Sequence, residues 1–308
     1  MKMKNYLILP LCSLLMLLAA CSGKTDGNRN IDSAGITFVE VGDSLLPLPQ
    51  PPASMTDPVK RADFVMMHFW DKLDFASAQA RDAAFMEQNF ATYTTLFGVA
   101  SEEGRQKSAD ALLLRAAQTP EMLERMMSTA EKYLADPNSP MRNEDAFIVM
   151  LRAALGTKKG DAAQNERWNY ALQTAMKNRP GTLATDFPVV SRDGKRSTLL
   201  ELARNSGAGQ VMLVFYDDDC ENCARILGEM RKEKQIADGI ASKQLCIIAV
   251  NATADPKTFH GSDKIPAEWL DNVPDISGGK TIDDLYSLPA MPVRYLLSPD
   301  GTVQGKDI

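Results

Sequence analysis

Two cysteines separated by two residues constrain the fold of this chain more than any other feature. Cys220-Glu221-Asn222-Cys223 follows an apolar run, 211–216, and opens a segment that has a helical pattern. Two intervening residues let both sulfurs share the first helical turn, where they can form a disulfide. The helix N-terminus offers unpaired N–H groups that favour a thiolate on Cys220. The sequence therefore predicts a redox dithiol at a junction between a strand and a helix.

The N-terminus has the pattern of an export signal. Lys2 and Lys4 precede a short, mostly apolar run, 7–20, which closes on small residues. A run of this kind indicates a signal peptide rather than a membrane-spanning helix. We expect residues 1–20 to be removed on export, and Cys12 to leave with them.

The end of the signal, Leu18-Ala19-Ala20-Cys21, resembles the lipobox of bacterial lipoproteins. That resemblance implies that Cys21 becomes the acylated first residue and anchors the protein to a membrane. Ser22 follows Cys21, and a serine at this position resembles the sorting signal of outer-membrane lipoproteins. The expected location is therefore the outer membrane, facing the periplasm. An ordinary signal peptide followed by an incidental cysteine is the alternative.

Composition narrows the possible functions. Acylation of Cys21 would leave three thiols, Cys220, Cys223 and Cys246, too few for a disulfide scaffold. Cys246 lies in an apolar run and is interpreted as a small core residue. The formal net charge of −6 argues against a nucleic-acid partner. We expect no cofactor, and no metal, because a metal site would need two more ligands beside the two cysteines.

The chain is expected to have two domains after the signal peptide. Residues 21–56 are interpreted as a polar tether and a Pro-rich linker, although 36–41 could pair as a strand. Residues 57–178 predict an all-helical domain of roughly six helices, because apolar residues recur at three- and four-residue spacing. Its methionine-rich faces are expected to pack in its own core and against the neighbouring domain; binding of a flexible partner is the alternative.

Residues 180–308 predict an α/β domain with a mixed sheet, so the fold class is α+β with two domains. Buried strands are expected at 211–216, 245–250 and 293–297, and a helix from Cys220 to about Gln235. Short helical pieces are expected at 266–270 and 281–285. A hairpin turn at Ser298-Pro299-Asp300-Gly301 completes the pattern.

This order resembles the TlpA/ResA-like group of exported thioredoxin-fold proteins. The resemblance rests on Pro180-Gly181-Thr182 with Asp186-Phe187, Asp193-Gly194-Lys195, the two cysteines, and 288–292 before the strand 293–297. The whole chain also resembles lipoproteins of anaerobic Gram-negative bacteria that carry a helical domain of unknown function before a thioredoxin domain. The resemblance implies that Pro292 is the family's cis-proline, and that Met291 and Pro292 bind the substrate beside the dithiol.

Three departures from that family pattern affect the expected chemistry. Asp217, Asp218 and Asp219 bring negative charge next to the would-be thiolate, and like charge disfavours ionisation. Val214 stands where many thioredoxins have a buried acid. The chain stops at Ile308, so the family's last helix is missing; either one sheet face is open, the helical domain covers it, or the sequence is truncated.

Two functions remain open at this point. In the first, the protein is an exported thiol–disulfide oxidoreductase in which Cys220 attacks and Cys223 resolves, working as a reductant on exported proteins with disulfides and receiving electrons from an unknown thiol donor. In the second, the fold is a scaffold for binding or assembly, and the two cysteines form a static disulfide. A metal site and a peroxiredoxin fit the sequence less well.

Overall fold

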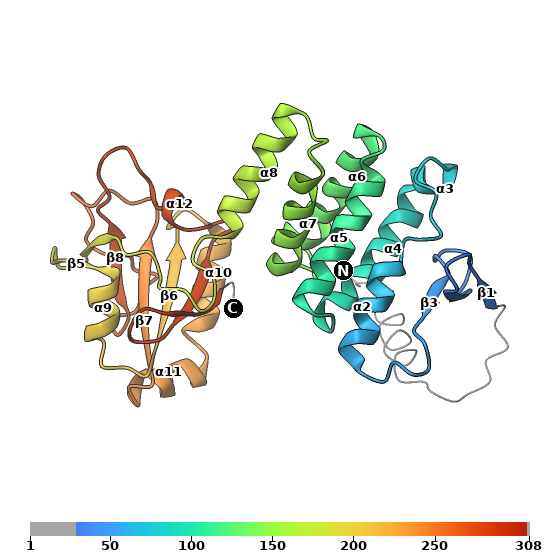
Figure 1. Cartoon of the computed structure of the whole chain (residues 1–308). Helices are drawn as coiled ribbons and strands as arrows, with labels where there is room; N and C mark the ends of the chain where they lie inside the picture. Colours follow the sequence, from blue (N-terminus) through green and yellow to red (C-terminus); the bar gives the residue numbers. More distant parts are fainter. Residues whose placement is uncertain (1–28, 307–308) are drawn as a thin grey trace. The chain divides into compact units, whose positions relative to one another are not determined.

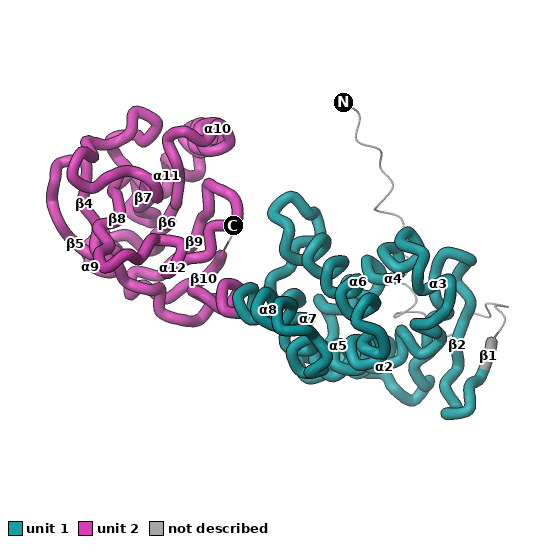
Figure 2. Tube along the Cα trace, turned by 90° about the horizontal axis from the view of Figure 1, so that it is seen from above, with its two compact units in different colours: residues 1–172 teal, residues 173–308 magenta. Residues whose placement is uncertain are grey.

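The computed structural model describes residues 29–306, and the chain divides into two compact units, residues 1–172 and 173–308 (Figure 2). The expected signal peptide, Cys21 and the last two residues lie outside the described residues. Between residues 29 and 306, no helix is long and apolar enough to cross a membrane.

The first unit is built mainly from helices (Figure 1). Each long helix starts where the sequence offers a capping side chain: Asp57 accepts hydrogen bonds from two N–H groups of the first turn, Pro58 follows it, and Thr119 and Pro120 repeat this arrangement. The helical elements are α2 (Pro58–His68), α3 (Ala78–Arg81), α4 (Ala83–Thr95), η1 (Leu96–Gly98), α5 (Glu102–Ala116), α6 (Pro120–Ala130), η2 (Glu131–Ala135), α7 (Glu144–Thr157) and α8 (Ala162–Ala175).

The segment that we interpreted as a linker is in fact folded. Strands β1 (Arg29–Ile31), β2 (Thr37–Val39) and β3 (Leu48–Gln50) form a small antiparallel sheet. Leu46 and Leu48 are buried in the core of the helical unit. The apolar side chains of this segment are few and closely followed by prolines, which explains why the sequence favoured a linker.

The side chain of Asn89 holds this segment to the helices. It is fully buried, its Oδ1 accepts from the Leu46 N–H at 2.8 Å, and its Nδ2 donates to the carbonyls of Ser44 (3.2 Å) and Phe85 (2.8 Å). All polar atoms of a buried amide are thereby satisfied, as burial requires.

The core of the first unit consists largely of aromatic and methionine side chains. Phe69, Trp70, Phe90 and Tyr93 are buried together, with Tyr93 in ring contact with the other three. The methionines of α6 belong to the same core: Met122, Met126 and Met127. The prediction that they pack in the unit's own core is confirmed.

The second unit contains a seven-stranded sheet with helices on both faces (Figure 1). Its elements are β4 (Pro188–Ser191), β5 (Arg196–Thr198), α9 (Leu199–Asn205), β6 (Gln210–Tyr216), α10 (Glu221–Met230), α11 (Lys234–Ala241), β7 (Leu245–Asn251), β8 (Leu270–Pro274), α12 (Ile282–Leu285), β9 (Val293–Leu297) and β10 (Val303–Lys306). The strand order is β10-β9-β6-β7-β8-β4-β5, with β6, β7 and β8 parallel and the other neighbours antiparallel.

Strand β6 lies in the middle of this sheet and supplies side chains to both faces. Because successive side chains alternate across a strand, Leu213 and Phe215 enter the core that includes α9 residues, whereas Val214 and Tyr216 enter the core that includes α10 residues. Cys223 and Leu227 of α10 belong to the second of these cores. The strand and the dithiol helix are thus fixed to each other by buried apolar contacts.

Two expected elements differ from the structure. The helix after the cysteines ends at Met230, and a separate helix, α11, begins at Lys234, where the sequence had suggested one continuous helix. The piece 266–270 is not helical, and Leu270–Pro274 is strand β8 instead. No helix follows β10 within the described residues, which end there.

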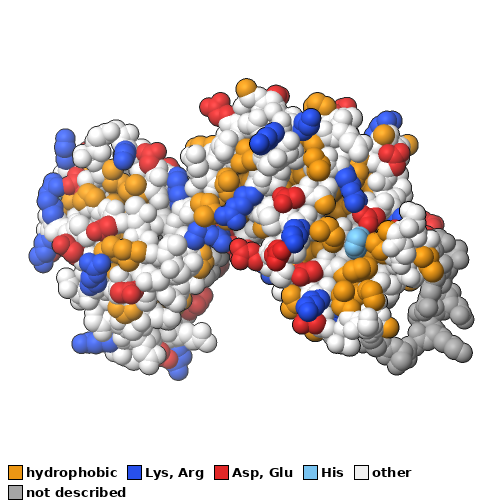
Figure 3. Space-filling model, in the orientation of Figure 1, with side chains coloured by type: hydrophobic (Ala, Val, Ile, Leu, Met, Phe, Trp, Pro, Cys, Tyr) orange, Lys and Arg blue, Asp and Glu red, His pale blue; other side chains and the backbone are white. Residues whose placement is uncertain are grey.

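The surface carries charges of both signs. On the face shown in Figure 3, Lys and Arg side chains are interspersed with Asp and Glu side chains over each unit. Exposed aromatic and aliphatic side chains also occur singly, for example Leu114 and Tyr170 in the first unit.

Replacement of Asn89 by alanine is expected to destabilise the helical unit by about 2–4 kcal/mol, because it leaves the buried Leu46 N–H and Ser44 carbonyl without partners. Urea unfolding followed by circular dichroism at 222 nm measures this. Asn169→Ala is the matched control: Asn169 is exposed and bonds only the Asn165 carbonyl, so a change within about 0.5 kcal/mol is expected. Equal effects of the two substitutions on the free energy of unfolding would contradict the role of Asn89 in holding residues 44–46 to the helices.

Candidate functional site

Cys220 lies at the junction that the sequence predicted. It is the N-cap residue of α10, directly after the loop that leaves β6, and its Sγ accepts a hydrogen bond from the Cys223 N–H at 3.2 Å. A sulfur in this position satisfies one of the unpaired N–H groups of the first turn, and the helix N-terminus favours negative charge on it. Cys220 is half-buried, so its sulfur remains within reach of a partner.

Cys223 lies one turn further on and is fully buried. Burial raises the pKa of its thiol well above the usual range; an N–H of Asp217 opposes this shift, while Cys220 and the Asp217 carboxylate reinforce it. Both cysteines are thiols in this structure. The two sulfurs therefore differ in the way that an exchange reaction needs, with one accessible and one protected.

The loop before β9 lies against the dithiol. The Met291–Pro292 peptide bond is cis, as the sequence resemblance implied. Cys220 Sγ lies 3.8 Å from the Met291 carbonyl oxygen, and Asn222 Nδ2 donates to the same oxygen at 3.1 Å. Met291 is half-buried and contacts the core that contains Cys223. Both candidate substrate-binding residues are thus beside Cys220.

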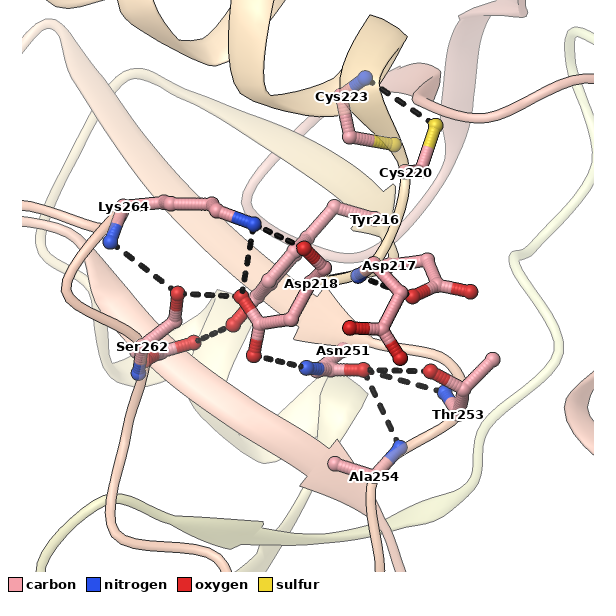
Figure 4. Close-up of polar contacts among 12 residues, drawn as sticks. Tyr216, Asp217, Asp218, Cys220, Cys223, Asn251, Thr253, Ala254, Ser262 and Lys264 are labelled. Carbon is pink, nitrogen blue, oxygen red and sulfur yellow. Dashed lines mark hydrogen bonds and ion pairs between the residues drawn. The ribbon is translucent and has the colours of Figure 1, made fainter.

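The acidic residues before Cys220 include Asp218, whose carboxylate is held by hydrogen bonds. Figure 4 shows Asp218 turned into a polar network below the dithiol. Its Oδ1 accepts from Ser262 Oγ at 2.6 Å, its Oδ2 accepts from Asn251 Nδ2 at 2.8 Å, and Lys264 Nζ lies 4.0 Å from Oδ1 and donates to the Asp218 carbonyl. The network holds the loop that leads to Cys220, and the lysine partly balances the negative charge.

A second carboxylate, Asp271 of β8, extends this network into the core. Its side chain is fully buried; Tyr216 Oη donates to Oδ1 at 2.7 Å, the Ser262 N–H donates to Oδ2 at 2.8 Å, and Arg192 lies 3.4 Å from Oδ2. Burial raises the pKa of Asp271, and the three donors reduce that shift.

The register of the sheet relates Asp271 to the position where the expected buried acid is missing. Val214 pairs with Ala249, and Ala249 pairs with Asp271, so the three residues form one row across β6, β7 and β8. Residues in such a row point to the same face. The buried acid is therefore present on the dithiol face, but two strands away, or about 10 Å.

Sequence reasoning missed this part of the site. Ser262, Lys264 and Asp271 lie in a stretch that we interpreted as loop and short helix, and their contacts depend on a strand that the sequence did not suggest. The one available signal was an Asp-Asn pair beside apolar residues at 270–273. The remaining thiol, Cys246, packs toward the core on the opposite face of the sheet from Cys223.

Comparisons with known proteins find one family model and several solved structures. A family model described as a domain of unknown function, DUF5106, matches residues 20–178. A crystal structure of a thioredoxin-like protein from Bacteroides caccae is 25% identical, with a TM-score of 0.74, over 87% of this chain and 95% of that chain. The expected thioredoxin-like fold behind a domain of unknown function is confirmed.

Other solved structures match a smaller share of the chain. The C-terminal domain of an uncharacterized protein from Bacteroides fragilis is 25% identical, with a TM-score of 0.37, over 42% of this chain and 91% of that chain. A thiol-disulfide oxidoreductase from the same species is 17% identical, with a TM-score of 0.33, over 41% and 90%. No curated protein matches the chain.

Tyr216→Phe is expected to destabilise the second unit by about 1.5–3 kcal/mol at pH 8, because it removes a donor to a buried carboxylate. The raised pKa of Asp271 means that its proton stabilises the folded state, and this contribution is lost as pH rises through that pKa. The hydroxyl of Tyr216 supports the ionised form, so the substitution should cost less at pH 4.5 than at pH 8.

Urea unfolding at both pH values measures this difference. Tyr286→Phe is the matched control, since the Tyr286 hydroxyl donates to a neutral acceptor, the Thr185 carbonyl. The same pH dependence in both variants would show that Asp271 is not responsible.

Proposed function

The chain belongs to the DUF5106 family, and we propose that its thioredoxin-like unit is a thiol–disulfide oxidoreductase that works through Cys220 and Cys223. The observation that carries this proposal is the arrangement of one accessible sulfur and one buried sulfur in a single helical turn. Cys220 Sγ receives the Cys223 N–H and lies next to the Met291 carbonyl. This geometry allows a disulfide to form between the two residues after small side-chain rotations.

The reaction has two exchange steps. The Cys220 thiolate attacks one sulfur of a substrate disulfide, the substrate S–S bond breaks, and the other substrate sulfur leaves as a thiolate that takes up a proton. Cys223 then loses its proton and attacks Cys220 Sγ, which releases the second substrate sulfur as a thiol. The substrate gains two electrons, and the protein is left with a Cys220–Cys223 disulfide that a thiol donor must reduce.

The reducing direction is part of this proposal. A protein is a strong oxidant when its reduced thiolate is stabilised, because the dithiol state is then preferred. The run of three acidic residues, 217–219, directly before the dithiol makes such stabilisation less favourable. The reduced protein is therefore proposed to donate electrons to its substrates.

The substrates and the location follow from the N-terminal pattern. Export and acylation at Cys21 would anchor the protein in the bacterial envelope, at the outer membrane facing the periplasm, where disulfide-containing exported proteins are available as substrates. Met291 and Pro292 would hold the substrate chain beside Cys220. An unidentified thiol protein or small thiol of that compartment would return the electrons.

Replacement of Cys223 by serine is expected to trap substrates, because the mixed disulfide on Cys220 is no longer resolved. The variant is expressed in a Gram-negative anaerobe, acid-quenched and analysed on non-reducing gels, where adducts should appear that disappear with reductant. The double variant Cys220→Ser/Cys223→Ser should show none. Cys223→Ser/Cys246→Ser should keep them, since Cys246 faces the other side of the sheet.

Absence of adducts, together with a fully oxidised Cys220–Cys223 pair in the unmutated protein, would contradict an exchange activity. That result would favour the alternative function, a binding or assembly lipoprotein in which the disulfide is static.

Resolution by Cys223 is expected to accelerate about tenfold per pH unit between pH 7 and pH 9, because only the thiolate attacks and the pKa of Cys223 lies well above this range. The raised pKa means that the thiolate fraction increases with pH throughout the window. A single turnover with excess aromatic disulfide, acid-quenched and followed by mass spectrometry of the Cys220 adduct, measures the rate. A rate independent of pH would indicate that a neighbouring base takes the proton.

A further inference from the structure

Asn222, the second residue between the two cysteines, connects the dithiol helix to the loop before β9. Its Nδ2 donates to the Met291 carbonyl at 3.1 Å, and Cys220 Sγ lies 3.8 Å from the same oxygen. The Met291 carbonyl oxygen is therefore in contact with both the Cys220 sulfur and the Asn222 amide. Asn222 itself is exposed, so this bond is formed at the surface.

Two further residues of α10 hold the Asn222 side chain in this position. Arg225 Nη2 donates to Asn222 Oδ1 at 2.7 Å, and Arg225 Nη1 donates to the two Glu229 carboxylate oxygens at 3.0 and 3.1 Å. The spacings of three and four residues put all three side chains on one face of the helix. The amide is thereby oriented with its NH2 group toward Met291.

The main chain of Met291 is a hydrogen-bonding edge beside Cys220. A disulfide joins two sulfurs about 2 Å apart, so a substrate cysteine on Cys220 must lie close to the Met291 carbonyl. In the described contacts the Met291 N–H has no acceptor, and Pro292 has no N–H to offer. An extended chain can pair with such an edge through its own N–H and carbonyl groups.

We propose that Asn222 is a specificity-determining residue that occupies the position of a substrate backbone N–H on the Met291 carbonyl. This inference rests on the proposed exchange activity and on the substrate binding by Met291 and Pro292 that the family resemblance implies; what it adds is the role of Asn222. A peptide N–H directed at the Met291 oxygen competes for it with the Asn222 amide. Asn222 therefore weakens the binding of extended chains, which favours release of the product, and it has no such effect on disulfides that lack a backbone.

An exchange equilibrium in the full chain tests this role. The Cys223→Ser protein carrying 2-mercaptoethanol on Cys220 is mixed with a linear peptide that contains one cysteine. The peptide thiol displaces 2-mercaptoethanol, one S–S bond replaces another, and mass spectrometry gives the equilibrium constant. Because 2-mercaptoethanol is the reference, changes in the reactivity of Cys220 itself cancel.

Asn222→Ala is expected to raise this constant about threefold to tenfold, the size of one additional hydrogen bond. Arg225→Ala should raise it in the same direction by less, because the amide remains but is no longer held. Asn169→Ala, an exposed asparagine of the helical unit, should leave it unchanged. With a peptide N-methylated at the residues on either side of its cysteine, Asn222→Ala should not raise the equilibrium constant.

The outcomes separate this inference from the proposed function. If 2-mercaptoethanol and the peptide both fail to form a disulfide with Cys220, the exchange activity is wrong and the inference falls with it. If both form but the constant is the same with and without Asn222, only the role of Asn222 is overturned. A gain that persists with the N-methylated peptide would also overturn it.

Discussion

The position of Cys220 as N-cap of α10 is the constraint on which the rest of the site depends. An N-cap side chain must point at the N–H groups of the first turn, so the Cys220 sulfur is directed toward the Cys223 N–H. The same geometry places Cys223 on the inner side of the helix, where Tyr216 and Leu227 bury it. The difference between the two thiols therefore follows from where the helix begins, and β6 fixes that point in the centre of the sheet.

Asp271 is a buried acid on the dithiol face of the sheet, but it does not stand at the position of Val214, where many thioredoxins have their buried acid. Asp271 occupies the same row of the sheet as Val214, two strands away, and Tyr216, which donates to it, belongs to the same core as Cys223. Its contacts with Ser262 connect it to Asp218, two residues before Cys220. The described contacts of this acid therefore lead to the loop before Cys220.

The dithiol and β6 could be predicted from the sequence because each depends on local signals: an apolar run, a helix start and a motif of fixed spacing. The cis bond at Pro292 was implied by the family resemblance and not by such a signal. Strand β8 could not be predicted, because Asp271, Asn272 and Pro274 are unfavourable in strands, and the strand is formed through pairing with β7 and β4. Of the sheet at 29–50, the sequence suggested only the strand at 36–41, which contains β2, because the burial of this segment depends on Asn89, more than forty residues away. Contacts between distant polar residues leave no periodic pattern.

The contacts on the two sides of the dithiol differ in strength. One side is the network of Asp218 and Asp271, and the other is the surface around Asn222. Below the dithiol, the Asp271 carboxylate is fully buried, and removing one partner of a buried charge pair costs roughly 3–5 kcal/mol. The partly exposed Asp218 is held by hydrogen bonds from Ser262 and Asn251. Above the dithiol, Asn222, Arg225 and Glu229 are exposed, and an exposed ion pair contributes only about 0–1 kcal/mol. A substrate can displace the exposed contacts at small cost, whereas the buried network stays in place. Under the proposed function, a substrate would therefore reach Cys220 from the side of Met291, where the contacts are exposed.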